Sequence, residues 1–353
     1  MVTAFFTTKK HKKHKIFNKL PESVEKMILH PLIVNAAKVL DGELLSREEA
    51  LALAENIPSG DLPDLLALAN RVRKKFAPAF HPCSIVNAKS GHCSQNCRFC
   101  AQSGHYATGI ETYAQLSPEE VLAAAEKVYS CGIRRFGYVG SGCGYLKVND
   151  EFRRILATLD LLHAQLPDME LCVSVGILSD ETARLLAEHH TFRYNMNLQT
   201  SPSRYSELIA DTHSIEDKIA TIRLLKKYGI SNCTGGILGL GESWADRIDL
   251  AYAIRDLDVE GIPLNILLPV RGTPLEKQPL LPAAEVAKAF ALFRLINPTK
   301  VIKFAAGRET IMKDFQALLM LSGASGIITG GYLTTRGRSI DEDLQMIRQL
   351  DQF

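Results

Sequence analysis

From about residue 82 onward, short apolar runs alternate with longer amphipathic stretches, and this alternation limits the possible folds more than any other feature of the chain. The apolar runs have the composition of buried strands and cover residues 84–86, 135–139, 171–175, 193–197, 232–237, 263–267, 301–305 and 326–329. The stretches between them have helical spacing and cover residues 118–129, 150–165, 180–189, 215–228, 244–257, 282–296 and 308–321. Strands joined by helical crossovers run parallel, and eight such strands close a barrel. We therefore predict an α/β fold, a (βα)8 barrel of the TIM type with an N-terminal helical extension; an open doubly wound sheet is the alternative.

The region ahead of the barrel divides by composition. Residues 1–20 contain six Lys and no acidic residue, which predicts a basic, solvated tail. Residues 21–78 carry helical patterns, and Ser46 followed by two glutamates is a typical helix start, so we expect a helical lead-in. Residues 79–353 make up the predicted barrel, with neither a sequence repeat nor an interior linker.

Composition also excludes several functional classes. The chain is 46% apolar with a net charge of +2, as expected for a globular protein. Because the basic excess lies in the first 20 residues, the barrel has no surplus of positive charge, and nucleic acid is not an expected partner. No apolar run approaches the roughly 20 residues that span a bilayer. No secretory signal opens the chain, so we expect a cytoplasmic protein without a membrane partner.

Three of the eight cysteines form a compact motif after the first predicted strand. Cys93, Cys97 and Cys100 have the spacing C-x3-C-x2-C. Three thiolates leave one iron of a [4Fe-4S] cluster open for a small chelating ligand. Structural zinc, the alternative, requires four protein ligands, usually in paired C-x2-C units. The motif therefore predicts an iron–sulfur cluster with an open coordination site.

This spacing resembles the signature of the radical S-adenosylmethionine (SAM) superfamily. The resemblance implies that the open iron chelates SAM, whose reductive cleavage yields a 5′-deoxyadenosyl radical that abstracts hydrogen. Phe99, directly before the third cysteine, matches the aromatic residue that these enzymes place against the adenine.

Longer motifs resemble one family, biotin synthase, from about residue 45 to the C-terminus. They cover residues 89–103, 106–110, 194–201, 233–242, 263–265, 272–274 and 306–309. The resemblance implies conversion of dethiobiotin to biotin by two hydrogen abstractions, with sulfur supplied by an auxiliary iron–sulfur cluster. It also implies a flavodoxin-like or ferredoxin-like electron donor and a homodimer.

The same resemblance assigns binding residues position by position. Asn197 and Asn265 match the asparagines that bind dethiobiotin, and Lys218 stands where an arginine usually pairs with the SAM carboxylate. Gln199 replaces an aspartate in the ribose contact. The glycine-rich strand end is expected to bring its backbone close to SAM, because glycine permits such an approach. The implied SAM contacts are Phe99, Asn197, Gln199, Lys218, Gly235, Gly236 and Glu242.

The auxiliary site departs from the better-known family pattern of three cysteines and one arginine around a [2Fe-2S] cluster. Cys172 and Cys233 match two of the cysteines. The third position is Gly137, and the arginine position is Lys303, which we expect to supply charge without ligating the cluster.

Other cysteines could replace the missing ligands. Cys83 is the leading candidate because it begins the first predicted strand, and Cys143, in the loop after the second strand, is a further candidate. Cys131 ends a helix on the opposite side of the barrel wall and is expected to be a buried apolar thiol. A thiolate-rich ligand set favours a four-iron auxiliary cluster over a [2Fe-2S] one.

Two alternatives stay open at this point. One is a related radical SAM enzyme with maturase-like or methylornithine-type chemistry. The other is a non-catalytic iron–sulfur scaffold or redox sensor, which would not need the matched SAM and dethiobiotin contacts.

Overall fold

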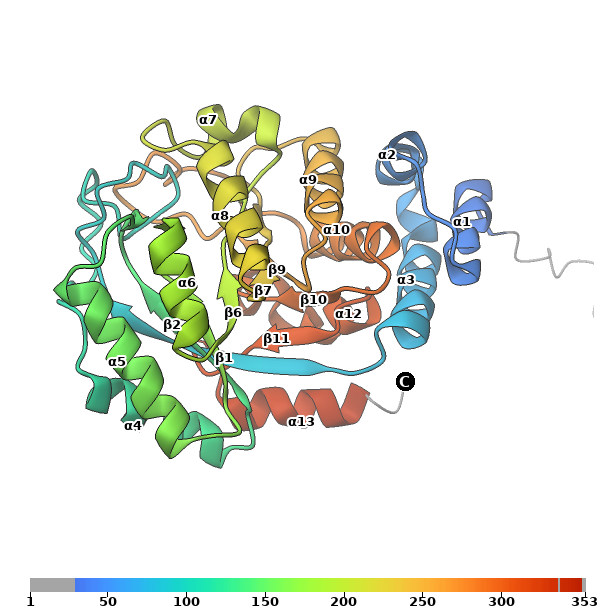
Figure 1. The fold of residues 1–353 in the computed structure, drawn as a ribbon. Helices are drawn as coiled ribbons and strands as arrows, with labels where there is room; N and C mark the ends of the chain where they lie inside the picture. Colours follow the sequence, from blue (N-terminus) through green and yellow to red (C-terminus); the bar gives the residue numbers. More distant parts are fainter. Residues whose placement is uncertain (1–28, 336, 351–353) are drawn as a thin grey trace, which may run out of the picture.

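A closed barrel of parallel strands forms the centre of the molecule (Figure 1). The structure is a computed structural model that describes residues 29–335 and 337–350, so the tail predicted for residues 1–20 lies outside the described residues. The barrel strands are β1 (His81–Lys89), β2 (Arg135–Gly140), β4 (Glu170–Ser174), β6 (Thr191–Asn195), β7 (Ser231–Cys233), β8 (Gly236–Leu238), β9 (Gly261–Ile266), β10 (Val301–Phe304) and β11 (Gly326–Ile328). Pairing of β1 with β11 closes the ring, and β7 and β8 together occupy one of its eight positions. The predicted TIM-type fold is confirmed.

Helices cover the outside of the barrel between successive strands (Figure 1). They are α4 (Pro118–Ser130), α5 (Asp150–Gln165), α6 (Asp180–Glu188), α8 (Ile215–Lys227), α9 (Trp244–Asp256) and α10 (Ala283–Ile296). Four of them begin with a serine whose hydroxyl accepts a hydrogen bond from the backbone of the third helical residue, namely Ser117, Ser179, Ser214 and Ser243. These caps satisfy backbone groups that the first turn leaves unpaired, so they fix where each crossover helix begins.

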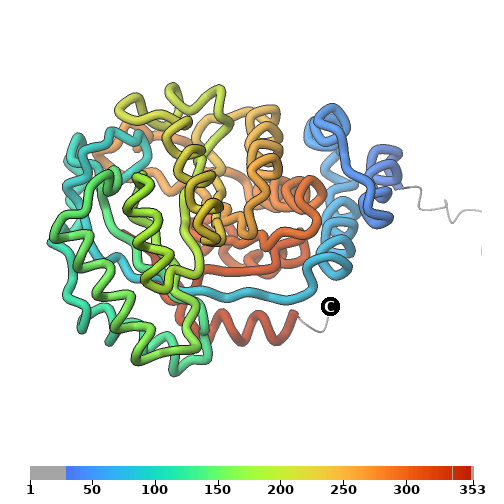
Figure 2. The backbone as a smooth tube through the Cα atoms, viewed as in Figure 1, coloured from blue at the N-terminus to red at the C-terminus, as the bar shows by residue number. Residues whose placement is uncertain are grey.

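A second layer of helices lies beside the barrel at the N-terminal end. It consists of α1 (Pro31–Ala36), η1 (Ala37–Asp41), α2 (Arg47–Asn56), η2 (Ser59–Asp61) and α3 (Leu62–Phe76). Figure 2 shows these blue helices against the orange α10. Glu49 in α2 accepts hydrogen bonds from Lys38 Nζ at 2.6 Å and from the Ser46 amide at 2.8 Å. These donors, Lys38 foremost, lower the pKa of Glu49 to about 2.

The C-terminal part departs from the predicted single helix over residues 308–321. The chain forms α11 (Arg308–Met312), η4 (Lys313–Phe315) and α12 (Gln316–Leu321), because Lys313 adopts a φ of 45°, which interrupts the helix. The sequence analysis also missed α13 (Ile340–Leu350), which crosses the barrel beside its first strand (Figure 1). Four further short elements were not predicted: β3 (Gly144–Tyr145), β5 (Ile177–Leu178), η3 (Pro202–Arg204) and the adjoining α7 (Tyr205–Leu208).

A buried ion pair attaches α13 to the barrel. Asp343 Oδ2 lies 2.7 Å from Arg308 Nη2 and accepts a second hydrogen bond from Thr329 Oγ1 at 2.6 Å. Both charged side chains are fully buried. Arg308 also donates to Gln316 and, at 3.0 Å, to the hydroxyl of Tyr332, so one guanidinium joins the segments that follow β10 and β11.

No helix among the described residues is long and apolar enough to cross a membrane.

Candidate functional site

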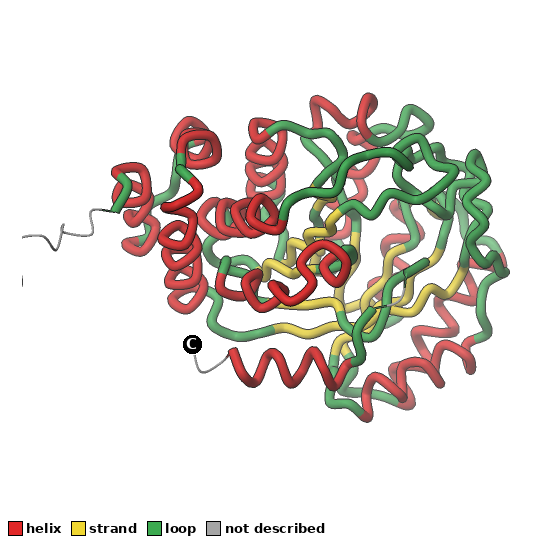
Figure 3. Tube along the Cα trace, turned by 180° about the vertical axis from the view of Figure 1, so that it is seen from behind, coloured by secondary structure: helices red, strands yellow, loops and turns green. Residues whose placement is uncertain are grey.

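A cavity of about 450 Å³ opens at the carboxyl ends of the barrel strands. Loops crowd this end of the barrel, as Figure 3 shows. Two of these loops touch where Gly272 packs against the Ala107 carbonyl. The lining combines cysteines, asparagines and a few cations with apolar side chains, as is typical of a ligand site in this fold.

The three cysteines of the C-x3-C-x2-C motif line one end of the cavity. The loop is held by hydrogen bonds from the Cys93 amide to the Gln102 carbonyl and from the Cys100 amide to the Cys97 carbonyl, each 3.0 Å. Burial raises the pKa of Cys97 to about 12, and the neighbouring thiol of Cys100 adds to the shift. Without a bound cation the thiols of Cys97 and Cys100 stay protonated, so these two metal ligands release protons on binding.

A second set of three thiols comes from separate strands deeper in the barrel. Cys83 lies on β1, Cys172 on β4 and Cys233 on β7, and all three line the same cavity. Lys303 on β10 donates a hydrogen bond to Cys83 Sγ at 3.3 Å and is 2% exposed. Burial alone would lower the pKa of Lys303, but the thiols of Cys83, Cys233 and Cys172 raise it above its ordinary value.

These thiols suit a cluster better than a single ion. Among residues 29–335 and 337–350, no three His, Cys, Asp or Glu side chains converge as the ligands of one metal ion would. Cluster thiolates bind different irons, so they do not need to meet at one point. A buried lysine without a carboxylate partner requires compensating negative charge, which thiolates on an anionic cluster provide.

Gly137, the position without the expected cysteine, lies directly beside this second thiol set. Gly137 pairs with Cys172 in the sheet, and a Cβ at Gly137 would lie 3.7 Å from the Cβ of Cys172. It would also lie 3.0 Å from a methyl group of Ile85, which occupies part of that space. A side chain at position 137 would therefore point toward the second thiol set, but Ile85 occupies part of the space that such a ligand would need.

The remaining two cysteines lie apart from both sets. Cys143 is exposed on the rim of the cavity, in the loop after β2. Cys131 caps the end of α4 with its sulfur 3.3 Å from the Lys127 carbonyl. It is half-buried, so the expectation of a buried apolar thiol was wrong: the helix end faces solvent rather than the core.

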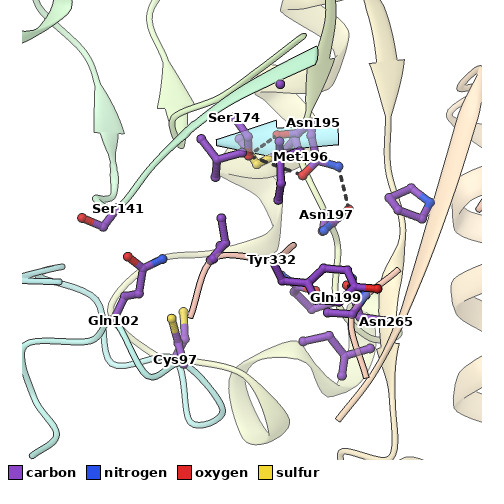
Figure 4. Close-up of a pocket in the computed structure, with 18 of the residues that line it drawn as sticks. Cys97, Gln102, Ser141, Ser174, Asn195, Met196, Asn197, Gln199, Asn265 and Tyr332 are labelled. Atoms are coloured by element: carbon purple, nitrogen blue, oxygen red, sulfur yellow. Dashed lines mark hydrogen bonds between the residues drawn. The ribbon is translucent and has the colours of Figure 1, made fainter. Parts of the chain in front are cut away.

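Polar side chains lie between the two cysteine sets. Figure 4 shows Cys97 at one end of the cavity, Ser174 and Asn195 at the other, and Asn197 between them. The amide oxygen of Asn197 accepts hydrogen bonds from the Gly235 amide at 3.0 Å and from Asn195 Nδ2 at 3.2 Å. This leaves the amide nitrogen of Asn197 available as a donor toward a ligand.

The other predicted contacts have different surroundings. Lys218 is half-buried and donates to the Asn197 carbonyl at 3.1 Å; desolvation lowers its pKa, while the thiols of Cys97 and Cys100 oppose that shift. Asn265 uses both ends of its amide on the Gly236 carbonyl and the Ala306 amide. Phe99 and Gln199 line the cavity. Gln199 has a φ of 73°, and its amide oxygen is buried without a partner.

The glycine-rich strand end is explained by packing rather than by approach to a ligand. Gly235 and Gly236 do not line the cavity. A Cβ on Gly235 would overlap the Pro263 carbonyl of β9, and one on Gly236 would lie 2.5 Å from Leu250. Glu242 binds the Gly239 amide at 2.8 Å and Arg247 Nε at 2.7 Å, so it closes the turn into α9. Packing within the barrel thus gives a reason for these glycines, and the contact of Gly235, Gly236 and Glu242 with SAM stays a prediction.

Sequence analysis missed three residues of the site. Arg193 on β6 lines the cavity and is 6% exposed; a cation inside an apolar strand, alternating with Asn195 and Asn197, was the available signal. Tyr332 lines the cavity from the loop after β11. His213 lies 4.0 Å from Cys97 Sγ and 2.7 Å from the Tyr205 hydroxyl. Burial lowers the pKa of His213 to about 4, so it is neutral at physiological pH.

Family models match both halves of the barrel. The model of the radical SAM superfamily matches residues 89–253, and that of the biotin and thiamin synthesis associated domain matches residues 263–352. A TIM-type barrel with three cysteines at the mouth of its cavity, matched by the first model, defines a radical SAM enzyme. The biotin synthase of Chlorobium limicola is 52% identical over 330 residues, which are 92% of this chain and 98% of the relative. That of Chlorobaculum tepidum is 54% identical over 329 residues, with the same coverage.

The chain belongs to the biotin synthase family, and the predicted resemblance is confirmed. Its members are radical SAM enzymes of sulfur insertion, so the predicted activity class is confirmed as well.

Solved structures add information on the fold alone. Methylornithine synthase has a TM-score of 0.76 at 18% identity, covering 90% of this chain and 95% of its own. A maturase of the [FeFe]-hydrogenase also has a TM-score of 0.76, at 16% identity, covering 90% and 73%. Both share the barrel, but at these identities they carry no argument for the alternative chemistries.

Proposed function

We propose that this enzyme converts dethiobiotin to biotin with sulfur from a four-iron auxiliary cluster held by Cys83, Cys172 and Cys233. The radical cluster is assigned to Cys93, Cys97 and Cys100. When bound, SAM and the radical cluster supply a hydrogen-abstracting radical, and the auxiliary cluster supplies the sulfur.

The observation that carries the auxiliary assignment is the buried Lys303 beside Cys83. Its ammonium lies 3.3 Å from Cys83 Sγ, and the pKa of Lys303 is raised by all three thiols. Three thiolates from three strands leave one iron of a four-iron cluster without a protein ligand, and that position is open to a sulfide that can be donated. Because Cys143 is exposed at the rim, it is not proposed as a ligand.

Substrate and SAM contacts follow from the free polar atoms of the cavity. The Asn197 amide nitrogen is oriented by the Gly235 amide, which binds the oxygen of the same side chain, and it donates to the ureido oxygen of dethiobiotin. Lys218 supplies a half-buried cation for the SAM carboxylate. The unpaired oxygen of Gln199 accepts a hydrogen bond from a ribose hydroxyl. Asn265 lines the same cavity with its amide held by Gly236 and Ala306, and its contact with dethiobiotin rests on the family resemblance.

Two further parts of the proposal rest on the family. The enzyme works as a homodimer and takes electrons one at a time from a flavodoxin-like or ferredoxin-like protein. Light scattering of the anaerobic enzyme tests the first, and turnover with each reduced donor tests the second.

Iron analysis with Mössbauer spectroscopy on anaerobically reconstituted protein tests the cluster assignment. Wild-type protein should bind about eight iron per chain, from two four-iron clusters. Cys83→Ser should reduce this to about four while SAM cleavage persists, and the matched Cys131→Ser variant should keep the full content. About six iron with a [2Fe-2S] signature, or full iron in Cys83→Ser, would contradict the assignment. Anaerobic rescue of a strain lacking biotin synthase tests the activity.

A further inference from the structure

Arg193 is a buried cation beside the second thiol set, and its side chain is only partly satisfied. Its Nε and Nη2 both donate to Ser231 Oγ at 3.3 Å. Its Nη1 is buried without a hydrogen-bond partner. Ser231 is a neutral acceptor, and the Phe192 ring, whose centroid lies 5.2 Å from the guanidinium carbon, compensates the charge only in part, which is costly in the interior of a barrel.

The free nitrogen lies in the same region as the thiol of Cys233. A Cβ on Gly261 would lie 3.7 Å from Arg193 Nη1 and 2.5 Å from Cys233 Sγ. Both groups therefore share the space in front of Gly261, which only a residue without a side chain leaves open. Arg193 also pairs with Cys172 in the sheet, so it lies between two of the three thiols. Consistently, its charge opposes the rise in the pKa of Cys172 that burial causes.

The second cation of the region lies on another strand. Lys303 contacts Cys83 from β10, whereas Arg193 approaches Cys172 and Cys233 from β6. The nearby Arg135 is paired with Glu170 and does not line the cavity. Among residues 29–335 and 337–350, Arg193 and Lys303 are thus the two cations that line the cavity beside the thiols without a carboxylate partner, Lys303 next to Cys83 and Arg193 on the side of Cys172 and Cys233.

We propose that Arg193 is a positioning residue of the auxiliary cluster, donating a hydrogen bond from Nη1 to the sulfur of Cys233 or to a cluster sulfide beside it. This rests on the proposed function, since it requires a cluster on these thiols. The arginine that faces the auxiliary cluster is then supplied by β6, while Lys303 occupies the position on β10 where the family pattern has its arginine. A hydrogen bond and a positive charge both stabilise the reduced, more negative cluster, so Arg193 raises its reduction potential.

The test is an anaerobic redox titration of the reconstituted enzyme, followed by electron paramagnetic resonance, with iron counted on the same samples. Arg193→Met should lower the potential of the auxiliary cluster by about 60 mV or more, a tenfold change in the one-electron equilibrium. Arg193→Lys keeps the positive charge but lacks the several N–H donors of the guanidinium. It should lower the potential of the auxiliary cluster by less than half as much as Arg193→Met does. Arg134→Met is the matched control, because Arg134 is exposed and binds the Tyr129 carbonyl outside the cavity. Its potential should equal that of the wild type.

Each result bears on the assignment. If Arg193→Met loses auxiliary iron while Arg193→Lys keeps it, the need for the cation is supported. An unchanged potential in Arg193→Met with full iron overturns the proposal, as does equal loss of iron in both variants. Wild-type protein with the radical cluster alone would overturn the auxiliary cluster itself and this role with it. That result is recognisable from the iron count before any variant is made.

Discussion

Removal of Asp343 should destabilise the enzyme far more than removal of an exposed acidic partner. In Asp343→Ala, the buried guanidinium of Arg308 loses the carboxylate 2.7 Å away, and Thr329 loses its acceptor. Breaking a fully buried ion pair costs about 3–5 kcal/mol. Glu309, which lies 3.1 Å from the same Arg308 nitrogen, remains to compensate in part, so we expect about 3 kcal/mol. At roughly 2 °C per kcal/mol for a chain of this size, the midpoint of thermal unfolding should fall by about 6 °C.

The measurement is scanning calorimetry of iron-loaded protein under argon at one fixed scan rate, since unfolding of such proteins is often irreversible. Glu188→Ala is the matched control: its ion pair with Arg184 is exposed and screened by solvent, so its loss should leave the midpoint nearly unchanged. The double variant Arg308→Met/Asp343→Leu should unfold at a higher temperature than Asp343→Ala, because it leaves no stranded charge. The reasoning is refuted if Asp343→Ala shifts the midpoint no more than Glu188→Ala does.

Three further variants test the local physics of the chain. The lowered pKa of Glu49 means that its ionised form stabilises the fold above pH 4.5 and that this contribution is lost as the pH falls toward 2. Glu49→Gln should therefore be less stable by about 1 kcal/mol at pH 7, with the thermal gap to wild type narrowing below pH 4.5; a gap independent of pH would contradict this. Gly235→Ala should lower stability by about 3 kcal/mol, because its methyl group overlaps the Pro263 carbonyl, whereas Gly60→Ala, with open space around it, should be nearly neutral. Gln199→Gly should be about 1 kcal/mol more stable than Gln199→Ala because of the positive φ, with an equal rise in the KM for SAM in both; a rise in neither would remove the ribose contact.

The strands and crossover helices were largely predictable because their signals are local. Apolar runs give the strands, and serine caps give the helix starts, so Ser117 and Ser214 mark boundaries that the structure keeps. The break between β7 and β8 was not predictable, since it depends on Gly235 meeting Pro263 from a neighbouring strand. The same limit applies to α13, whose position depends on the distant partner Arg308.

The residues of the site also differ in how far they could be predicted, because some depend on local sequence and others on contacts between distant segments. The radical cysteines form one short motif, so their proximity is encoded in the spacing itself. The proximity of Cys83 to Lys303, which are 220 positions apart in sequence, could only be expected from the barrel topology. Arg193 was missed because its role depends on the open space in front of Gly261, which no property of either residue alone reveals.

Arg193 and Asn195 on β6 and Asn197, two residues beyond its end, all line the cavity, and this spacing has a consequence for how such a site can evolve. An extended chain rises about 3.3 Å per residue, so these alternate side chains enter the cavity at intervals of roughly 7 Å along the backbone. The length of this backbone segment fixes the distance between the deep thiols and the mouth of the cavity. Substitution of a side chain does not change that distance. Ligands can be exchanged between strands while the separation of the two ends stays constant. An inserted or deleted residue in β6, in contrast, would turn every one of these side chains to the wrong face at once.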